Sequence, residues 1–210
     1  MSGRIFTNTS DLVAFATKLI KVERLPSLKK DVNICVSTAC AFPALLYCFS
    51  TIDLLATLFK GQLKPTSANA RDYMQKFMKN NHITYTPYEV QLLQKIYRHK
   101  VVHVAQPKPL IEIGADKITW RYDNVNLSNH LKIETIPVPQ LITAFIAPYR
   151  MDFNKIFVIS ILKLAQDIED SVLRPNDGYL DMLINNSVVD VKPLQDCFED
   201  AVEAIYDPKQ

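Results

Sequence analysis

The feature that most constrains the fold is a stretch of twenty-one residues without a formal charge, from Val32 to Ile52. A segment of this length and polarity is either buried inside a protein or crosses a bilayer. Its several polar residues, Pro43 in its middle and Asp53 directly after it favour burial, and no aromatic belt or basic flank marks its ends. We therefore expect one long buried helix over 31–59, bent near Pro43, and no association with a membrane. A membrane-spanning helix is the alternative.

Helical periodicity and stop signals extend over most of the remaining chain. Only four glycines are present, which favours helices over a turn-rich β-fold. Thr9-Ser10-Asp11 offers N-caps for a first helix that runs to about Val22 and ends at Leu25-Pro26-Ser27. Thr86-Pro87 has the residues of an N-cap followed by proline in the first turn, so a helix is expected from there to about His103. Further helices are expected over 67–80, 140–149, 153–174 and 193–206.

The stretch between 110 and 136 alternates in polarity, which is typical of strands. The runs 110–113 and 117–122 flank a Gly-Ala-Asp turn and predict a hairpin, and 130–134 is a candidate third strand. The predicted fold is therefore mainly α: a helical bundle with a small antiparallel β-hairpin or meander inserted at 110–136. A length of 210 residues suits a single domain over 1–210.

Cysteine usage and the N-terminus favour a reducing compartment. The four cysteines show neither CxxC pairing nor zinc-ligand spacing, and three of them lie in the uncharged stretch, where buried thiols are expected. The first residues are polar and contain no apolar core of a signal peptide. We expect a cytoplasmic protein.

Charge is unevenly distributed although the net charge is only +2. Residues 60–108 contain nine Lys or Arg and two acidic residues, a net charge of +7. Residues 151–210 contain five basic and twelve acidic residues, a net charge of −7. The basic half suits a polyanionic ligand. Alternatively, the two halves neutralise each other within one fold or across a dimer.

The basic half contains the run Tyr97-Arg98-His99-Lys100-Val101-Val102-His103 at the end of a predicted helix. Arginine can grip a phosphate with two hydrogen bonds, and histidine exchanges protons near neutral pH. Arg98 and His103 are five residues apart, hence about 140° around a straight α-helix, so a bend or a dimer is needed to bring them together. The same residues could simply be solvated cations that complement the helix C-terminus. His99 and His103, one turn apart, could instead bind zinc, although no third ligand is evident.

Arg98 and His103 have the form Arg-x4-His, which resembles the signature of the HEPN superfamily. The preceding segments agree: an apolar helix ending in Lys60-Gly61, and a helix ending in the run 73–79. The resemblance covers about residues 30–109. The chain has Lys100 where similar proteins often have glycine, which affects the detailed geometry of the motif.

The resemblance implies a helical bundle that dimerises with two motif helices facing each other and, in catalytic members, metal-independent RNA cleavage. Arg98 is then expected to bind the scissile phosphate, His103 to act on the 2′-hydroxyl or the leaving oxygen, and His99 to orient them. Further substrate contacts are expected from Lys95, Lys100 and Asp53, although Asp53 could merely lie on an exposed helix face.

The expected function is thus a toxin- or defence-type endoribonuclease that acts on single-stranded RNA as a homodimer, without metal or cofactor. The alternative is a non-catalytic HEPN-like module that binds RNA, a nucleotide or a protein partner such as an antitoxin. Trp120, together with Arg121 and Tyr122, could stack on bases, but packing of the hairpin onto the helices is the commoner role for such residues.

Overall fold

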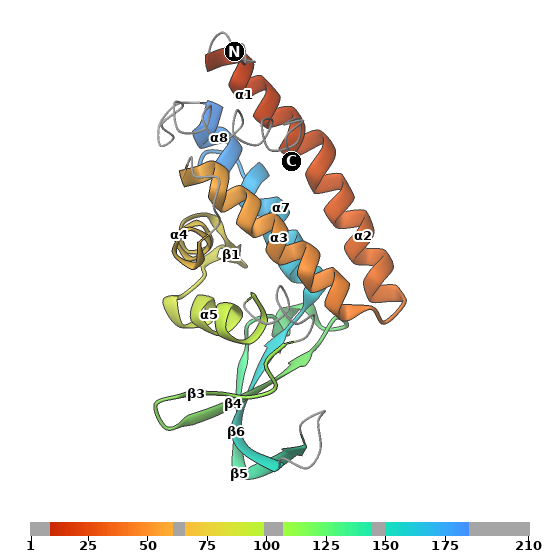
Figure 1. The fold of residues 1–210 in the computed structure, drawn as a ribbon, viewed down its shortest axis with the longest axis vertical. Coiled ribbons are helices and arrows are strands. Elements are labelled where there is room, and N and C mark those ends of the chain that lie inside the picture. Colours follow the sequence, from red (N-terminus) through yellow and green to blue (C-terminus); the bar gives the residue numbers. More distant parts are fainter. Residues whose placement is uncertain (1–8, 61–65, 99–106, 144–149, 185–210) are drawn as a thin grey trace, which may run out of the picture. The chain divides into compact units, whose positions relative to one another are not determined.

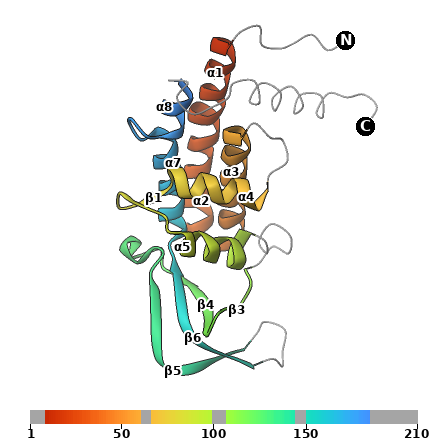
Figure 2. The same ribbon diagram turned by 90° about the vertical axis from the view of Figure 1, so that its left-hand side faces the viewer.

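The computed structural model describes residues 9–60, 66–98, 107–143 and 150–184. These residues form a mixed α/β fold with two sheets, one of two antiparallel strands and one of four mixed strands (Figures 1 and 2). The prediction of a mainly α bundle with a small hairpin is therefore wrong. The reason is that segments expected to be helical form two long strands, β5 (Ile133–Thr143) and β6 (Arg150–Ile159).

The chain divides into two compact units, each made of segments that are separate in the sequence. The first contains residues up to 29, 50–85 and those from 167 onward, and the second contains 30–49 and 86–166. The organisation of 1–210 as one domain stays a prediction.

The first helical segment continues through the predicted stop at Leu25-Pro26-Ser27. It comprises α1 (Thr9–Thr17), the π-helical η1 (Lys18–Arg24) and α2 (Leu25–Ser37). The Leu25 N–H donates to the Ile20 carbonyl, five residues back. Proline lacks an N–H and disrupts the ordinary α-helical bonding pattern. Because the wider π turn lies immediately before Pro26, the chain stays helical across it.

The expected long helix over 31–59 is two helices, α2 and α3 (Ala41–Lys60), separated by a break. Ala39 has a left-handed φ of 58°, and the Cys40 N–H donates to the Cys35 carbonyl at 2.7 Å. This six-residue closure ends α2 in the manner of a Schellman motif. Pro43 lies in the first turn of α3, where N–H groups lack helical acceptors. Its role is therefore to begin a helix and not to bend one.

Among the described residues, α3 is long and apolar enough to cross a membrane by length and composition. However, 56% of its most apolar window is buried inside the protein, as in the core helix of a soluble protein. The prediction of a buried stretch is right only in part: Cys48 and Ile52 on α3 are buried, whereas Ile34 and Cys40 before it are exposed.

The core of the first unit is a group of aromatic rings. They come from α3 (Phe59), α4 (Ser67–Phe77) and α8 (Tyr179–Ile184). The Phe59 and Phe77 rings meet edge to face with centroids 5.1 Å apart, and Tyr73 packs 5.0 Å from Phe77. The helix predicted over 67–80 ends earlier, at Phe77, because β1 (Lys79–Asn80) pairs with β2 (Ile83–Thr84).

Polar groups along α7 (Ile161–Leu173) hold the segment 73–85 in place within the first unit. The Tyr85 hydroxyl donates to Asp167 Oδ2 at 2.7 Å, and both residues are buried. One turn further on, the hydroxyls of Tyr73 and Ser171 are hydrogen-bonded at 2.9 Å.

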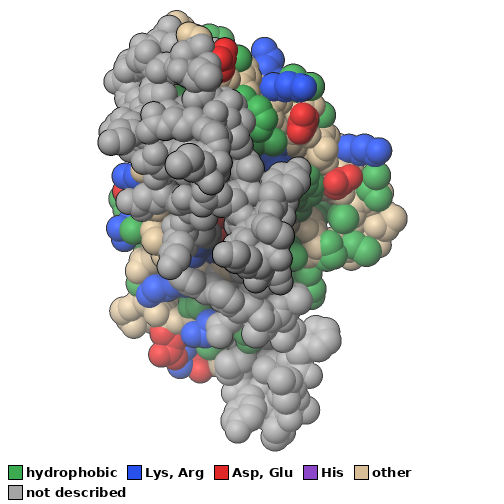
Figure 3. All heavy atoms as spheres, turned by 45° about the horizontal axis from the view of Figure 1, so that its top comes forward, with side chains coloured by type: hydrophobic (Ala, Val, Ile, Leu, Met, Phe, Trp, Pro, Cys, Tyr) green, Lys and Arg blue, Asp and Glu red, His purple; other side chains and the backbone are tan. Residues whose placement is uncertain are grey.

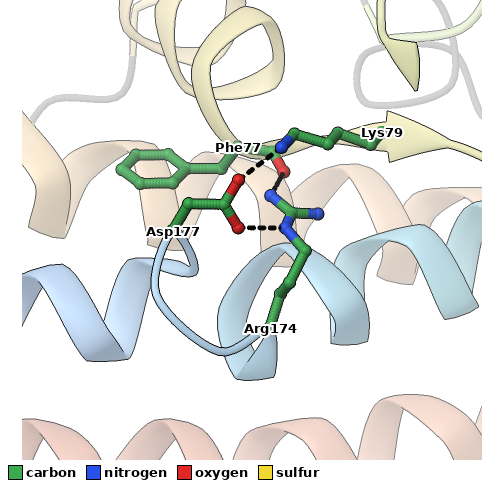
Figure 4. A network of polar contacts seen from close by, with 4 residues as sticks. All are labelled: Phe77, Lys79, Arg174 and Asp177. Carbon is green, nitrogen blue, oxygen red and sulfur yellow. Dashed lines mark hydrogen bonds and ion pairs between the residues drawn. The ribbon is translucent and has the colours of Figure 1, made fainter. Parts of the chain in front are cut away.

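Beyond the end of α7, charged side chains make further contacts with the segment 73–85, as Figure 4 shows. Asp177 accepts hydrogen bonds from both Lys79 and Arg174, and Arg174 Nη2 also donates to the Phe77 carbonyl at 2.7 Å. The two cations lower the pKa of Asp177. The turn is tight at Gly178, where a Cβ would lie 2.4 Å from the Arg174 carbonyl oxygen. Glycine is therefore required there.

The second unit contains the four-stranded sheet, in the order β3-β4-β6-β5. β3 (Ile111–Ile113) and β4 (Asp116–Tyr122) form the hairpin predicted from the alternating sequence. β4 then pairs in parallel with β6, and β6 pairs antiparallel with β5. The hairpin is thus one half of a larger mixed sheet.

The helices expected over 140–149 and 153–174 are wrong in their first parts. Residues 140–143 belong to β5, and 153–159 belong to the central strand β6, so helix α7 begins only at Ile161. Pro137 and Pro139 lie within β5, which is an edge strand, at a shift in pairing register between Thr135 and Gln140. Edge strands and bulges are the places where a sheet tolerates proline.

Two side chains cap the N-terminus of α7. The Asn124 amide oxygen accepts from the Ile161 N–H at 2.7 Å, and Ser160 Oγ accepts from the Lys163 N–H at 3.2 Å. The adjacent His130 is buried, and its Nδ1 accepts from the Ser160 N–H at 3.1 Å. Because this nitrogen accepts a backbone hydrogen bond, it is not positioned to activate the Ser160 hydroxyl, and the cluster is a capping arrangement.

Candidate functional site

The motif helix begins as the sequence predicted. Thr86 caps α5 (Pro87–Leu92): Thr86 Oγ1 accepts from the Glu89 N–H at 3.2 Å, and the Glu89 carboxylate accepts from the Thr86 N–H at 2.7 Å. This reciprocal capping box, with Pro87 in the first turn, fixes the start of the helix. The predicted N-cap is confirmed.

The helix changes form before the motif. η2 (Leu93–Arg98) is π-helical, and it carries both Lys95 and Arg98. In a π-helical turn the hydrogen bonds join residues five apart, and such turns are frequent at functional sites. The separation of about 140° between Arg98 and His103 assumed a straight α-helix of 3.6 residues per turn. That assumption does not hold for the turn that leads into the motif.

Tyr97 anchors the end of η2 in the core of the second unit. Its buried ring packs against the rings of Phe49, Trp120, Tyr122 and Phe157, with centroids 5.8–6.4 Å apart. Burial, with a further contribution from Tyr122, raises the pKa of Tyr97 well above its ordinary value. The aromatic residues of the hairpin therefore pack onto the motif helix.

Arg98 directly follows this anchor and ends η2. It is only 9% exposed, whereas Lys95 on the same turn is exposed. A guanidinium is planar and can bind a planar anion through two hydrogen bonds.

Hydrogen bonds connect η2, which precedes the motif, to the segment 107–109, which follows it. The Lys108 N–H donates to the Ile96 carbonyl at 2.8 Å, and the Lys108 carbonyl accepts from Trp120 Nε1 at 2.9 Å. Next to it, Thr119 Oγ1 donates to the Pro109 carbonyl at 2.9 Å. The segment 107–109 is thus fixed between η2 and β4, and Lys108 lies beside the end of the motif helix.

The predicted site residues fall into three groups. Arg98 and Lys95 lie together on η2 in the second unit. Asp53 lies half-buried on α3 in the first unit. His99, Lys100 and His103 lie outside the described residues, as does the possible zinc pair formed by the two histidines.

Lys108 is the residue that sequence reasoning missed as a site residue. It was counted among the basic residues of 60–108, but nothing in its spacing links it to Arg98. A usable signal was the Pro107-Lys108-Pro109 pattern, since two flanking prolines restrict the backbone and project one lysine from a rigid segment.

The opposite charges of the two halves are neutralised only in part. Lys79 pairs with Asp177 within the first unit, and basic and acidic side chains lie interspersed on the face drawn in Figure 3. In the second unit, Lys95 and Lys108 form no ion pair with any residue in the described ranges. Within the described ranges, these two lysines therefore carry charges that no acidic side chain neutralises.

Among the described residues, no three His, Cys, Asp or Glu side chains lie together in a way that could hold a metal ion. Comparisons with protein-family models, curated proteins and solved structures give no match for this chain. The HEPN resemblance consequently stays an expectation based on the motif.

Proposed function

We propose that the chain is a metal-independent endoribonuclease, of the toxin or defence type, that cleaves single-stranded RNA in the cytoplasm. The observation that supports this best is the cationic end of the motif helix. There Arg98 follows the buried Tyr97, and the exposed Lys95 and Lys108 have no ion pair among the described residues. Such a cluster favours a phosphate-bearing ligand.

In the proposed reaction the RNA supplies its own nucleophile, the 2′-hydroxyl. This oxygen attacks the adjacent phosphorus, the bond to the 5′ oxygen breaks, and a 2′,3′-cyclic phosphate forms. His103 moves the proton from the attacking hydroxyl or to the leaving oxygen, and Arg98 stabilises the additional negative charge. His99 orients these groups, and Lys100 and Lys95 contact the substrate. We further propose a homodimer, in which two copies of the motif complete one site.

The experiment is incubation of purified protein with mixed single-stranded RNA in excess EDTA. Chelator-resistant cleavage with cyclic phosphate ends is expected. His103→Ala should reduce the rate by about 10²–10⁴-fold and Arg98→Ala by about 10²–10³-fold. Lys132→Ala, which removes an exposed cation near Glu134, is the matched control and should cleave normally. Equal cutting of DNA, or full activity in a folded Arg98→Ala/His103→Ala variant, would contradict the mechanism.

A second candidate function is a non-catalytic module that binds RNA, a nucleotide or a protein partner. The low exposure of Arg98 favours it, because an arginine that is only 9% exposed suits a structural role in the second unit. Binding of RNA without any cleavage in the same experiment would support this second function.

A further inference from the structure

Lys108 combines a rigid backbone with an exposed side chain that has no ion pair among the residues the structure describes. Both of its backbone polar groups are hydrogen-bonded, the N–H to the Ile96 carbonyl and the carbonyl to Trp120 Nε1. Pro109 follows it and is itself held by Thr119. Surface lysines in mobile loops lose conformational entropy when they bind. At Lys108 the backbone is already ordered in the folded protein, so binding costs little further backbone entropy.

Most other charged residues of the second unit's sheet have an opposite charge beside them. Lys117 contacts Asp152 at 2.7 Å, Lys155 contacts Asp116 at 2.7 Å, and Arg121 contacts Glu134 at 2.8 Å. Lys95 and Lys108, in contrast, have no such partner in the described ranges, although the Lys108 backbone is bonded to the residue that follows Lys95. Among the described residues, these cations of the sheet are paired with acidic side chains, and Lys95 and Lys108 are not.

We infer that Lys95 and Lys108 form a phosphate-binding subsite, separate from Arg98, that holds the backbone of a single-stranded nucleic acid at the end of η2. This inference rests on the proposed function for its ligand. Ammonium groups bind phosphate as point charges and do not read the sugar. The subsite therefore binds RNA and DNA strands alike, whereas cleavage requires the 2′-hydroxyl. Trp120 is a positioning residue for it, because its indole N–H fixes the Lys108 carbonyl.

The test measures binding of a single-stranded DNA oligonucleotide, which the proposed reaction cannot cut, at several salt concentrations. Lys108→Ala and Lys95→Ala should each weaken binding about fivefold near 0.1 M salt and reduce the magnitude of the salt slope by about 0.7, the value for one phosphate contact on a single strand. Lys108→Arg should retain the affinity. Lys132→Ala removes the same charge from an exposed lysine near Glu134 and is the matched control. It should bind like the unmodified protein.

Trp120→Phe is a second test variant, and it leaves the charge of the protein unchanged. It keeps an aromatic ring against Tyr97 but removes the hydrogen bond to Lys108, so it should lower affinity less than Lys108→Ala and leave the salt slope unchanged. Binding by Lys108→Ala that equals Lys132→Ala, with an unchanged slope, would overturn the inference. Loss of binding in the lysine variants of a protein that never cleaves RNA would leave the subsite standing and refute the nuclease proposal.

Discussion

His130 is held neutral inside the second unit, where burial and the nearby charge of Lys163 lower its pKa to about 3. In the unfolded chain the pKa of histidine is about 6.5. Between these values the unfolded state binds a proton that the folded state does not. The free energy of unfolding therefore falls as the pH decreases from about 6.5 toward 3, by about 1.4 kcal/mol per unit.

His130→Asn should remove this contribution to the pH dependence, since an asparagine oxygen can still accept from the Ser160 N–H. Urea denaturation at pH 7 and pH 5 measures it. The unmodified protein should lose roughly 2 kcal/mol more than the variant between these two values. If both proteins lost the same free energy of unfolding, protonation of His130 would not destabilise the folded state.

The buried carboxylate of Asp167 gives a second prediction for a single residue. Tyr85→Phe removes the hydroxyl that donates to it and should lower the free energy of unfolding by about 2–3 kcal/mol. Tyr73→Phe is the matched control, because its partner Ser171 still donates to the Ile168 carbonyl. That change should cost only about 1 kcal/mol. Equal effects of the two variants in denaturant titrations would contradict a larger contribution of the hydrogen bond to Asp167.

At the scale of elements, the break between α2 and α3 predicts a substitution that raises the free energy of unfolding instead of lowering it. Ala39 has a positive φ of 58°, which strains any residue with a Cβ. Ala39→Gly should therefore stabilise the protein by about 1 kcal/mol. Ala14→Gly, at an exposed position inside α1, should destabilise it by a similar amount. Thermal unfolding of both variants measures the difference, and destabilisation by Ala39→Gly would argue against a left-handed cap there.

The elements that were predictable from sequence are those specified by local chemistry. The N-cap at Thr86 and the hairpin around Gly114 depend on neighbouring residues, so their sequence signals sufficed. β6 was mistaken for helix because its apolar residues, such as Ile156 and Ile159, also match a helical spacing that continues into α7. This segment is a strand because it pairs with β4 and β5. Pairing between segments that are distant in the sequence gives no signal in the local sequence.

The candidate site divides in the same way. Arg98 and Lys95 could be named because they lie three residues apart on one predicted helix. Lys108 could not, since its place beside Ile96 results from a hydrogen bond across the chain between the two segments.

At the scale of the whole molecule, the proposed dimer gives the simplest measurement. Light scattering at micromolar concentration should give about 48 kDa, twice the chain mass of 24.0 kDa. An isologous dimer places two copies of the motif near one two-fold axis. A mass of one chain, unchanged by addition of a single-stranded oligonucleotide, would remove the argument for a site shared between copies.

The outer strands of the four-stranded sheet also bear on how the protein behaves when it is abundant. An exposed strand offers unpaired N–H and C=O groups to which another chain can add, and this is a common route to aggregation. Here one edge, β3, is only three residues long. The other, β5, contains Pro137 and Pro139, which have no N–H to donate. Edge-to-edge growth of the sheet is therefore blocked on both sides, so these strands should not seed fibrils even at high expression levels.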